Sequence, residues 1–288
     1  MRLGIHTFIS GSLEGAARKA ADLGANTFQI FSASPRMWRA SAPHPQQVRL
    51  LDAARQRYDL HPLVIHVNYL INLASLDPVI RAKSIAAFRG ELERAHAIGA
   101  EYLVLHPGSH KGGSIEQGIA AFVLGLRDAA QGLPAHQVTV LLENTAGAGS
   151  HLGSRFEELK SMRDRAAELT RLPIGYCLDT CHLLAAGFDI ATQSGLRDTL
   201  RSAESLLGLD SVHVIHANDS KSPLASHVDR HANIGEGHIG ADAFRRILTH
   251  PKLRRKPFIL ETPIDEEGDD RRNLDKLKSL ATRRGKAT

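Results

Sequence analysis

Short apolar runs recur along this chain of 288 residues, and longer stretches between them carry apolar residues at every third or fourth position. The runs have the length and composition of β-strands, and the stretches between them have the period of amphipathic helices. Helices are predicted over 13–23, 78–98 and 156–169, among others. The eight runs predicted as strands are Leu3–His6, Thr27–Phe31, Leu63–His66, Tyr102–His106, Val138–Glu143, Ile174–Asp179, Val212–His216 and Phe258–Glu261.

This alternation predicts an α/β fold, a parallel (β/α)8 or TIM barrel. The predicted strands are apolar at both odd and even positions, so both of their faces are apolar. This is expected when one face lines the barrel and helices cover the other. The chain is slightly longer than the roughly 250 residues typical of such a barrel, so one domain over 1–288 is expected. From about residue 271 the sequence is basic, and we interpret this segment as a solvated helix with a frayed end rather than a nucleic-acid-binding arm.

The third to eighth predicted strands each end on a residue type that ligates metals. Active sites of such barrels lie at the carboxyl ends of the strands, so side chains far apart in the sequence should share one site. A lone histidine at a strand end is more often a hydrogen-bonding residue, but six such ends together favour a metal centre. The six residues are His66, His106, Glu143, Asp179, His216 and Glu261.

Two loop segments add ligands of the same kind. Asp179 and His182 lie three apart on the turn after the sixth strand, and Asp229 and His231 lie two apart on an extended segment. Five histidines and four carboxylates would serve about three ions at three protein ligands per catalytic zinc. Imidazole and carboxylate ligands without thiolate suit Zn²⁺, with Mn²⁺ or Fe²⁺ as lesser options. The net positive charge left after binding would suit a phosphodiester.

Three other residues with metal-ligating side chains are assigned structural roles. His213 has the opposite parity to His216 on the seventh strand, so it is predicted to point to the other face. Cys177 and Cys181 flank Asp179 with a spacing that fits neither zinc knuckles nor haem attachment. We therefore expect both cysteines to be buried, reduced and structural.

Charge and hydropathy limit the partners and the location of the protein. The net charge of +5 and the pI near 9.4 favour a polyanionic partner without naming one. No basic segment followed by an apolar one opens the chain, and no apolar run approaches 18 residues. The expectation is a cytoplasmic protein without signal peptide or membrane span. No obligate protein partner is evident, so a monomer is expected.

Several segments at the predicted strand ends form longer motifs. They are HVNYLINL at 66–73, LHPGS at 105–109, ENTAG at 143–147, CLDTCH at 177–182, HANDSK at 216–221, DRH at 229–231, GEG at 235–237 and LETP at 260–263. With these motifs, in this order, the chain resembles the endonuclease IV family of apurinic/apyrimidinic endonucleases nearly end to end.

The resemblance implies a DNA-repair enzyme that cleaves the phosphodiester 5′ to an abasic site in double-stranded DNA, leaving a 3′-hydroxyl and a 5′-deoxyribose phosphate. It also implies three zinc ions, for which Mn²⁺ could substitute. Glu143 would bridge the first two ions, and Glu261 would orient the attacking water, which makes these two residues catalytic. The implied sets are His66, His106 and Glu143; Glu143, Asp179, His216 and Glu261; and His182, Asp229 and His231.

The resemblance further implies side chains that wedge into the bent DNA, at Arg36 and Tyr69. The chain departs from the family in two nearby loops, with Phe8 where the family usually has serine and Ser34 where it usually has asparagine.

Two other function classes stay open from the residues alone. A divalent-metal sugar-phosphate isomerase or epimerase could use the same barrel, but it would not need His182, Asp229 and His231. A barrel that binds damaged nucleic acid without cutting it would be expected to lack some ligands, and none is missing here.

Overall fold

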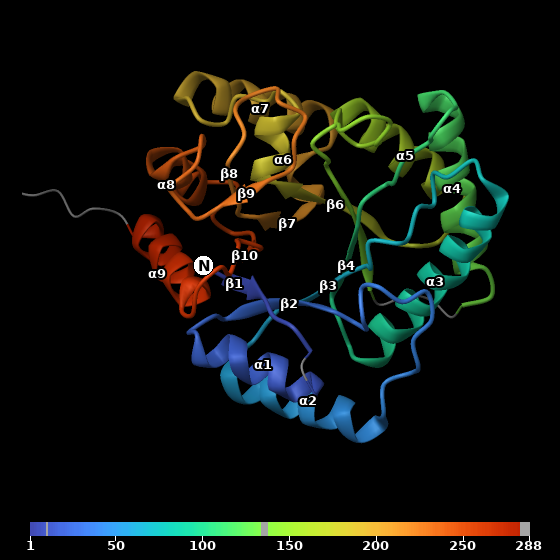
Figure 1. Cartoon of the computed structure of the whole chain (residues 1–288), viewed down its shortest axis with the longest axis horizontal. Helices are drawn as coiled ribbons and strands as arrows, with labels where there is room; N and C mark the ends of the chain where they lie inside the picture. The colour runs from blue at the N-terminus through green and yellow to red at the C-terminus, as the bar shows by residue number, and fades with distance from the viewer. Residues whose placement is uncertain (10, 134–137, 283–288) are drawn as a thin grey trace, which may run out of the picture.

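The computed structural model describes residues 1–9, 11–133 and 138–282 as a closed barrel of parallel strands surrounded by helices (Figure 1). Around the barrel the strands follow the order β1-β10-β7-β6-β5-β4-β3-β2. The predicted (β/α)8 fold is therefore confirmed, with strand ends that agree to within one residue. The barrel strands are β1 (Leu3–His6), β2 (Thr27–Phe31), β3 (Leu63–His66), β4 (Tyr102–Leu105), β5 (Thr139–Glu143), β6 (Ile174–Asp179), β7 (Val212–His216) and β10 (Phe258–Leu260).

The helices cover the outside of the barrel, and several begin at a clear local signal. Asp77, for example, accepts hydrogen bonds from the backbone N–H groups of Val79 and Ile80, and Pro78 follows it at the first helical position. The helices are α1 (Leu13–Asp22), α2 (Pro45–Tyr58), α3 (Pro78–Ala97), α4 (Ile115–Ala130), α5 (Phe156–Leu169), α6 (Thr180–Ala185), α7 (Gln193–Leu206), η1 (Leu209–Ser211), α8 (Ala241–Thr249) and α9 (Asp269–Ala281). Within the described residues, no helix is both long enough and apolar enough to cross a membrane.

Most of the basic C-terminal segment belongs to α9. Leu274, Leu277 and Leu280 are buried on the apolar face of this helix. Residues 271–281 are therefore an amphipathic helix packed against the barrel, while 283–288 lie outside the described residues.

An apolar floor closes the barrel interior below the carboxyl ends of the strands. Each of its members lies two residues before one of the six predicted strand-end ligands. Because side chains two apart on a strand point to the same face, these ligands form the next layer above the floor. The floor consists of the fully buried residues Val64, Val104, Leu141, Cys177, Val214 and Ile259.

Between β7 and α8 the chain leaves the barrel and returns over its mouth. Two short antiparallel strands, β8 (Asp219–Ser220) and β9 (His231–Ala232), pair Ser220 with His231. The buried Asp219 carboxylate accepts backbone hydrogen bonds from four residues of this excursion, namely Ser220, Gly235, Ile239 and Gly240. The Asp219 carboxylate therefore ties several parts of the excursion together, and the pairing with Ser220 positions His231.

The prediction for His213 was wrong. The β6–β7 register shifts between Tyr176 and Cys177, so that His213 is an extra residue between two paired ones and the alternation of faces breaks there. Its ring stacks on Tyr102, with centroids 5.4 Å apart, and Tyr102 packs against the apolar floor. His213 therefore lies inside the barrel near its amino end, well below the predicted ligands.

Candidate metal centre

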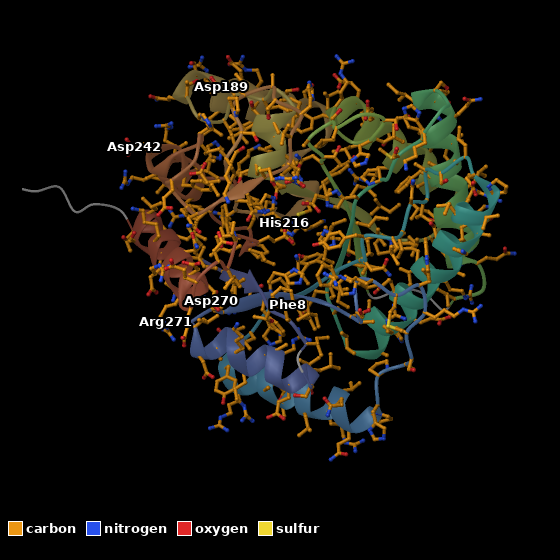
Figure 2. The ribbon with its side chains drawn as sticks, in the orientation of Figure 1. Phe8, Asp189, His216, Asp242, Asp270 and Arg271 are labelled. Atoms are coloured by element: carbon orange, nitrogen blue, oxygen red, sulfur yellow. The ribbon has the colours of Figure 1, made fainter. Side chains whose placement is uncertain are left out.

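The predicted ligands meet at the mouth of the barrel. Figure 2 shows His216 near the middle of the barrel, whereas Asp189 and Asp242 lie at its periphery. Three sets of ligand atoms each lie within 4.8 Å of one another. Their members are His66, His106 and Glu143; Glu143, Asp179, His216 and Glu261; and His182, Asp229 and His231. These are the same sets that the family resemblance implies, and we call them the first, second and third groups.

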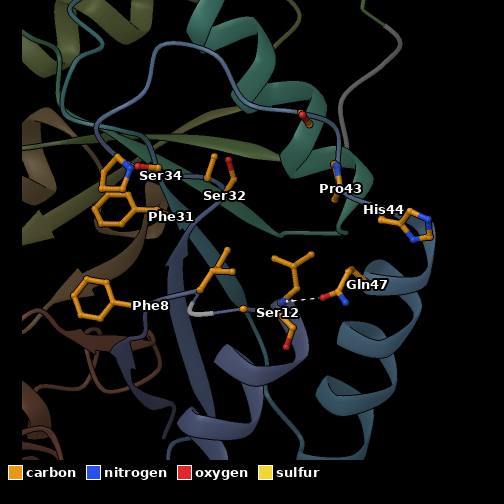
Figure 3. A pocket seen from close by; sticks show the side chains of 14 residues that line it. Phe8, Ser12, Phe31, Ser32, Ser34, Pro43, His44 and Gln47 are labelled. Atoms are coloured by element: carbon orange, nitrogen blue, oxygen red, sulfur yellow. Dashed lines mark hydrogen bonds between the residues drawn. The ribbon is translucent and has the colours of Figure 1, made fainter.

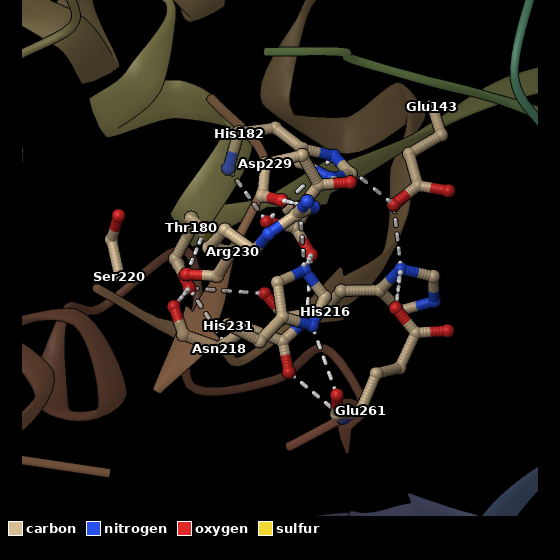
Figure 4. Close-up of polar contacts among 12 residues, drawn as sticks. Glu143, Thr180, His182, His216, Asn218, Ser220, Asp229, Arg230, His231 and Glu261 are labelled. Carbon is tan, nitrogen blue, oxygen red and sulfur yellow. Dashed lines mark hydrogen bonds and ion pairs between the residues drawn. The ribbon is translucent and has the colours of Figure 1, made fainter. Parts of the chain in front are cut away.

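Glu143 is fully buried and belongs to two of the groups. Its Oε2 lies 3.2 Å from Nε2 of His66 and 3.0 Å from Nε2 of His106. Its Oε1 lies 2.7 Å from Nδ1 of His216 (Figure 4). Burial raises the pKa of Glu143, but His216 and His106 outweigh burial and hold this pKa well below its usual range. The ionised carboxylate can therefore present one oxygen to each group.

The third group joins α6 to the excursion. Asp179 caps the start of α6 by accepting a hydrogen bond from the backbone N–H of His182 at 2.8 Å. The Asp229 carboxylate lies 3.2 Å from Nε2 of His182 through Oδ2 and 3.2 Å from Nε2 of His231 through Oδ1 (Figure 4). This half-exposed aspartate brings the two histidines of the group together.

The pKa values in the third group reflect its excess of negative charge. Burial lowers the pKa of His182, but Asp179, Asp229 and Glu143 together raise it to about 10. Burial likewise lowers the pKa of His231, but Asp229 and Asp179 raise it to about 9. Such a site attracts positive charge, whether protons or a metal cation.

Backbone carbonyls orient three of the histidine rings. Nδ1 of His66 donates to the carbonyl oxygen of Val67 at 2.7 Å, and Nδ1 of His182 donates to that of Asn144 at 2.9 Å. Nδ1 of His231 donates to the carbonyl oxygen of Glu261 at 2.9 Å. In the neutral form of each ring, Nε2 then carries the lone pair and faces the carboxylates. Metal-ligating histidines are arranged in this way.

One buried nitrogen atom of the third group further supports a metal ion at this site. Nε2 of His231 is buried and has no hydrogen-bond partner among the described residues, although a carboxylate oxygen of Asp229 lies 3.2 Å away. A buried polar atom normally has a partner. A divalent cation between this nitrogen and the neighbouring carboxylates would supply one, so the donor set fits metal ions.

Two asparagines support these ligands and were given no role from the sequence, although both lie in the quoted motifs. Asn144 accepts a hydrogen bond from the backbone N–H of Asp179 at 2.7 Å. Asn218 donates to Oδ2 of Asp179 at 2.6 Å and accepts from the backbone N–H of Glu261 at 2.8 Å. Each asparagine lies one or two residues after a predicted ligand, and this position is the feature of the sequence that indicates a supporting role.

The cysteines are free and buried, as predicted. Cys177 lies within reach of Glu143 and His216, and Cys181 within reach of Asp179 and His231. Burial raises the pKa of both thiols to about 12. A protonated thiol has to lose its proton before it can bind a metal, and the structural role of both cysteines stays a prediction.

The rim beside the first group carries the predicted DNA contacts. Arg36 follows β2 and is exposed, and Tyr69 follows β3 and is 72% exposed.

A cavity of about 570 Å³ lies between the loops after β1 and β2 (Figure 3). Phe8 and Ser34, the two departures from the family pattern, both line it.

Lys252, Arg254, Arg255 and Lys256 form a basic cluster at the opposite end of the barrel. It precedes β10, and Arg254 and Arg255 line a surface hollow with Met1 and Arg2, which precede β1. Lys252 pairs with Glu204 at 2.6 Å. This cluster is therefore remote from the three groups.

Comparison with known proteins gives a consistent assignment. Residues 17–280 match the model of a family described as xylose isomerase-like TIM barrel. The chain is 78% identical over 281 residues to a probable endonuclease 4 of Solibacter usitatus, covering 98% of this chain and 97% of that protein. It is 41% identical over 263 residues to a probable endonuclease 4 of Halothermothrix orenii, covering 91% and 94%.

Solved structures agree with the sequence relatives. Endonuclease IV from Thermus thermophilus superposes with a TM-score of 0.85 at 36% identity, covering 97% of this chain and 98% of that one. A D-tagatose 3-epimerase-like protein superposes with a TM-score of 0.70 at 20% identity, which shows a shared fold alone. The chain belongs to the endonuclease IV family of apurinic/apyrimidinic endonucleases, which are DNA-repair hydrolases.

Proposed function

We propose that this protein is a zinc-dependent endonuclease that hydrolyses the phosphodiester 5′ to an abasic site in double-stranded DNA, leaving a 3′-hydroxyl and a 5′-deoxyribose phosphate. The observation that carries the proposal is the grouping of nine ligand residues into three sets, two of which share Glu143. Family membership supports the same activity. In this proposal the protein acts as a monomer.

Each group would hold one zinc ion, with Mn²⁺ as a substitute. Zinc in such a site supplies positive charge to a phosphodiester and lowers the pKa of a coordinated water to about 7. The donor atoms are the imidazole nitrogens and carboxylate oxygens described above, and the two buried thiols are not needed.

Two carboxylates would act on the reacting groups. Glu143 is held ionised between the first and second groups, so it fixes their spacing. Glu261 has a side chain that is 17% exposed, and its Oε2 lies 3.3 Å from Nδ1 of His216. Because Glu261 is partly open to the mouth, it can accept a hydrogen bond from an attacking water and orient it. Arg36 and Tyr69 would then hold the opened DNA.

The third group distinguishes this function from a sugar isomerase or epimerase on the same barrel. Such an enzyme polarises a carbonyl or hydroxyl with one or two ions, whereas a third group suits a substrate that develops more negative charge. The relation to the epimerase-like structure rests on the fold alone, and a fold does not determine a reaction.

The direct test is cleavage of a labelled duplex that carries one tetrahydrofuran analogue of an abasic site. We expect a single incision 5′ to the analogue, a product end that a DNA polymerase extends, and about three zinc ions per chain by elemental analysis. The matched intact duplex and the chelator-treated protein are the controls. Zinc-loaded protein that leaves the analogue duplex uncut would refute the proposal.

A further inference from the structure

One buried amide, that of Gln29, touches the second group without belonging to it. Gln29 lies on β2 with its side chain fully buried, at the level of His6 in the neighbouring strand β1. Its side chain contacts three polar groups at once: Oε1 of Glu261 at 2.6 Å, Nδ1 of His6 at 2.9 Å and Nε2 of His216 at 2.9 Å. Every hydrogen-bonding atom of the amide is therefore used.

The carboxylate of Glu261 decides which way the amide points. An ionised carboxylate only accepts hydrogen bonds, so the amide nitrogen of Gln29 must be the atom that faces it. As a ligand of the second group, Glu261 would bind a cation in its ionised form. The reversed amide would place two acceptors 2.6 Å apart.

The orientation of the amide in turn determines the state of His216. Oε1 of Gln29 can only accept, so Nε2 of His216 carries a proton and donates it. In the neutral ring the lone pair then lies on Nδ1. That atom is 2.7 Å from Oε1 of Glu143 and 3.3 Å from Oε2 of Glu261, where the second group converges.

We propose that Gln29 is a positioning residue that fixes the tautomer of His216 and the orientation of Glu261, and so prepares the second group for its ion. His216 would bind through Nδ1, whereas the carbonyl contacts leave Nε2 as the ligand atom of His66, His182 and His231. Partners of this kind typically change metal affinity by about 10- to 100-fold. The inference rests on the metal centre of the proposed function and is independent of its DNA substrate.

The test compares Gln29→Met, which keeps the volume and removes the hydrogen bonds, with Thr27→Val. Thr27 lies two residues earlier on the same face of β2, is fully buried, and donates to the carbonyl oxygen of Pro62, just before β3. Zinc affinity is measured by competition with a chromophoric chelator, and the melting temperature is measured on metal-free protein. Long-range ¹H–¹⁵N spectra of histidine-labelled, zinc-loaded protein report which ring nitrogen is protonated.

We expect Gln29→Met to lower the affinity for one zinc ion by about 10- to 100-fold and Thr27→Val to leave the affinities for all ions unchanged. The wild-type spectrum should contain one zinc-bound histidine that is protonated on Nε2, and Gln29→Met should change the signals of this histidine. A purely structural role would instead lower the metal-free melting temperature in both variants at unchanged affinity, and that result would overturn the inference. So would a wild-type spectrum in which every zinc-bound histidine is protonated on Nδ1. Wild-type protein that binds no zinc would refute the metal centre itself, whereas bound zinc without DNA cleavage would refute only the substrate.

Discussion

Replacing Tyr69 with alanine should separate DNA recognition from stability. The ring is 72% exposed, so only about a quarter of a surface of roughly 200 Å² is covered, against Phe31 and His66. At about 25 cal/mol per Å², the truncation costs about 1 kcal/mol of folding free energy. In a chain of this length that lowers the melting temperature by about 2 °C.

The effect on DNA should be larger if Tyr69 is a wedge. Stacking of an aromatic side chain on a base contributes about 1–3 kcal/mol, so its loss should reduce the preference for abasic over intact duplex by about 5- to 150-fold. Affinities for both duplexes are measured by fluorescence anisotropy at one salt concentration, with zinc content measured on the same preparation. Zinc content should not change, because Tyr69 is no ligand.

Tyr58→Ala is the matched control. Tyr58 ends α2, at the amino end of the barrel, and it is more buried than Tyr69. Its loss should therefore lower the melting temperature more and leave the affinity ratio unchanged. An unchanged ratio in Tyr69→Ala, with a melting temperature lowered as far as in Tyr58→Ala, would show that Tyr69 only packs the rim.

Three further perturbations test other parts of the structure. Glu143→Ala should lose more zinc and more cleavage activity than His182→Ala, because Glu143 serves two groups and His182 one; equal losses by elemental analysis and incision assay would contradict the bridging role. Neutralising the four basic residues of 252–256 should leave the salt dependence of DNA binding unchanged, whereas a slope flatter by about one unit would place this cluster at the DNA. In the metal-free folded protein the pKa of His182 is raised to about 10 and that of His231 to about 9, against 6.5 in the unfolded chain. These shifts stabilise the folded protein fully below pH 6.5, and this stabilisation is lost as the pH rises through the two folded values. Its melting temperature should therefore fall between about pH 7 and 10, while the gain from added zinc grows as ligation releases protons; a metal-free melting temperature that rises with pH would refute this.

The sequence predicts the barrel and its strand-end ligands for one physical reason. Each ligand ends an apolar run, and apolar runs of strand length in a β/α alternation leave few other folds. Glu143 and Glu261 could be placed in one site although they are far apart in the chain, because all strands of a parallel barrel end on the same rim.

Other features depend on register, which one sequence does not specify. His213 follows simple alternation in the sequence, and only the shift between β6 and β7 turns it inward. Gln29 ends no run, since β2 continues to Phe31, so nothing local marks it as a neighbour of His216 and Glu261. Asp219 is likewise one acid in a polar loop until the excursion folds around it.

The apolar floor of the barrel also has a kinetic consequence. Six closely packed side chains with no exposed surface seal the interior below the ligands, so ions and water exchange with solvent only through the mouth. A duplex bound across Arg36 and Tyr69 would cover that route. The rate at which the enzyme loses zinc to a chelator would then depend on how much of the time DNA occupies the mouth, and substrate would protect the centre from demetallation.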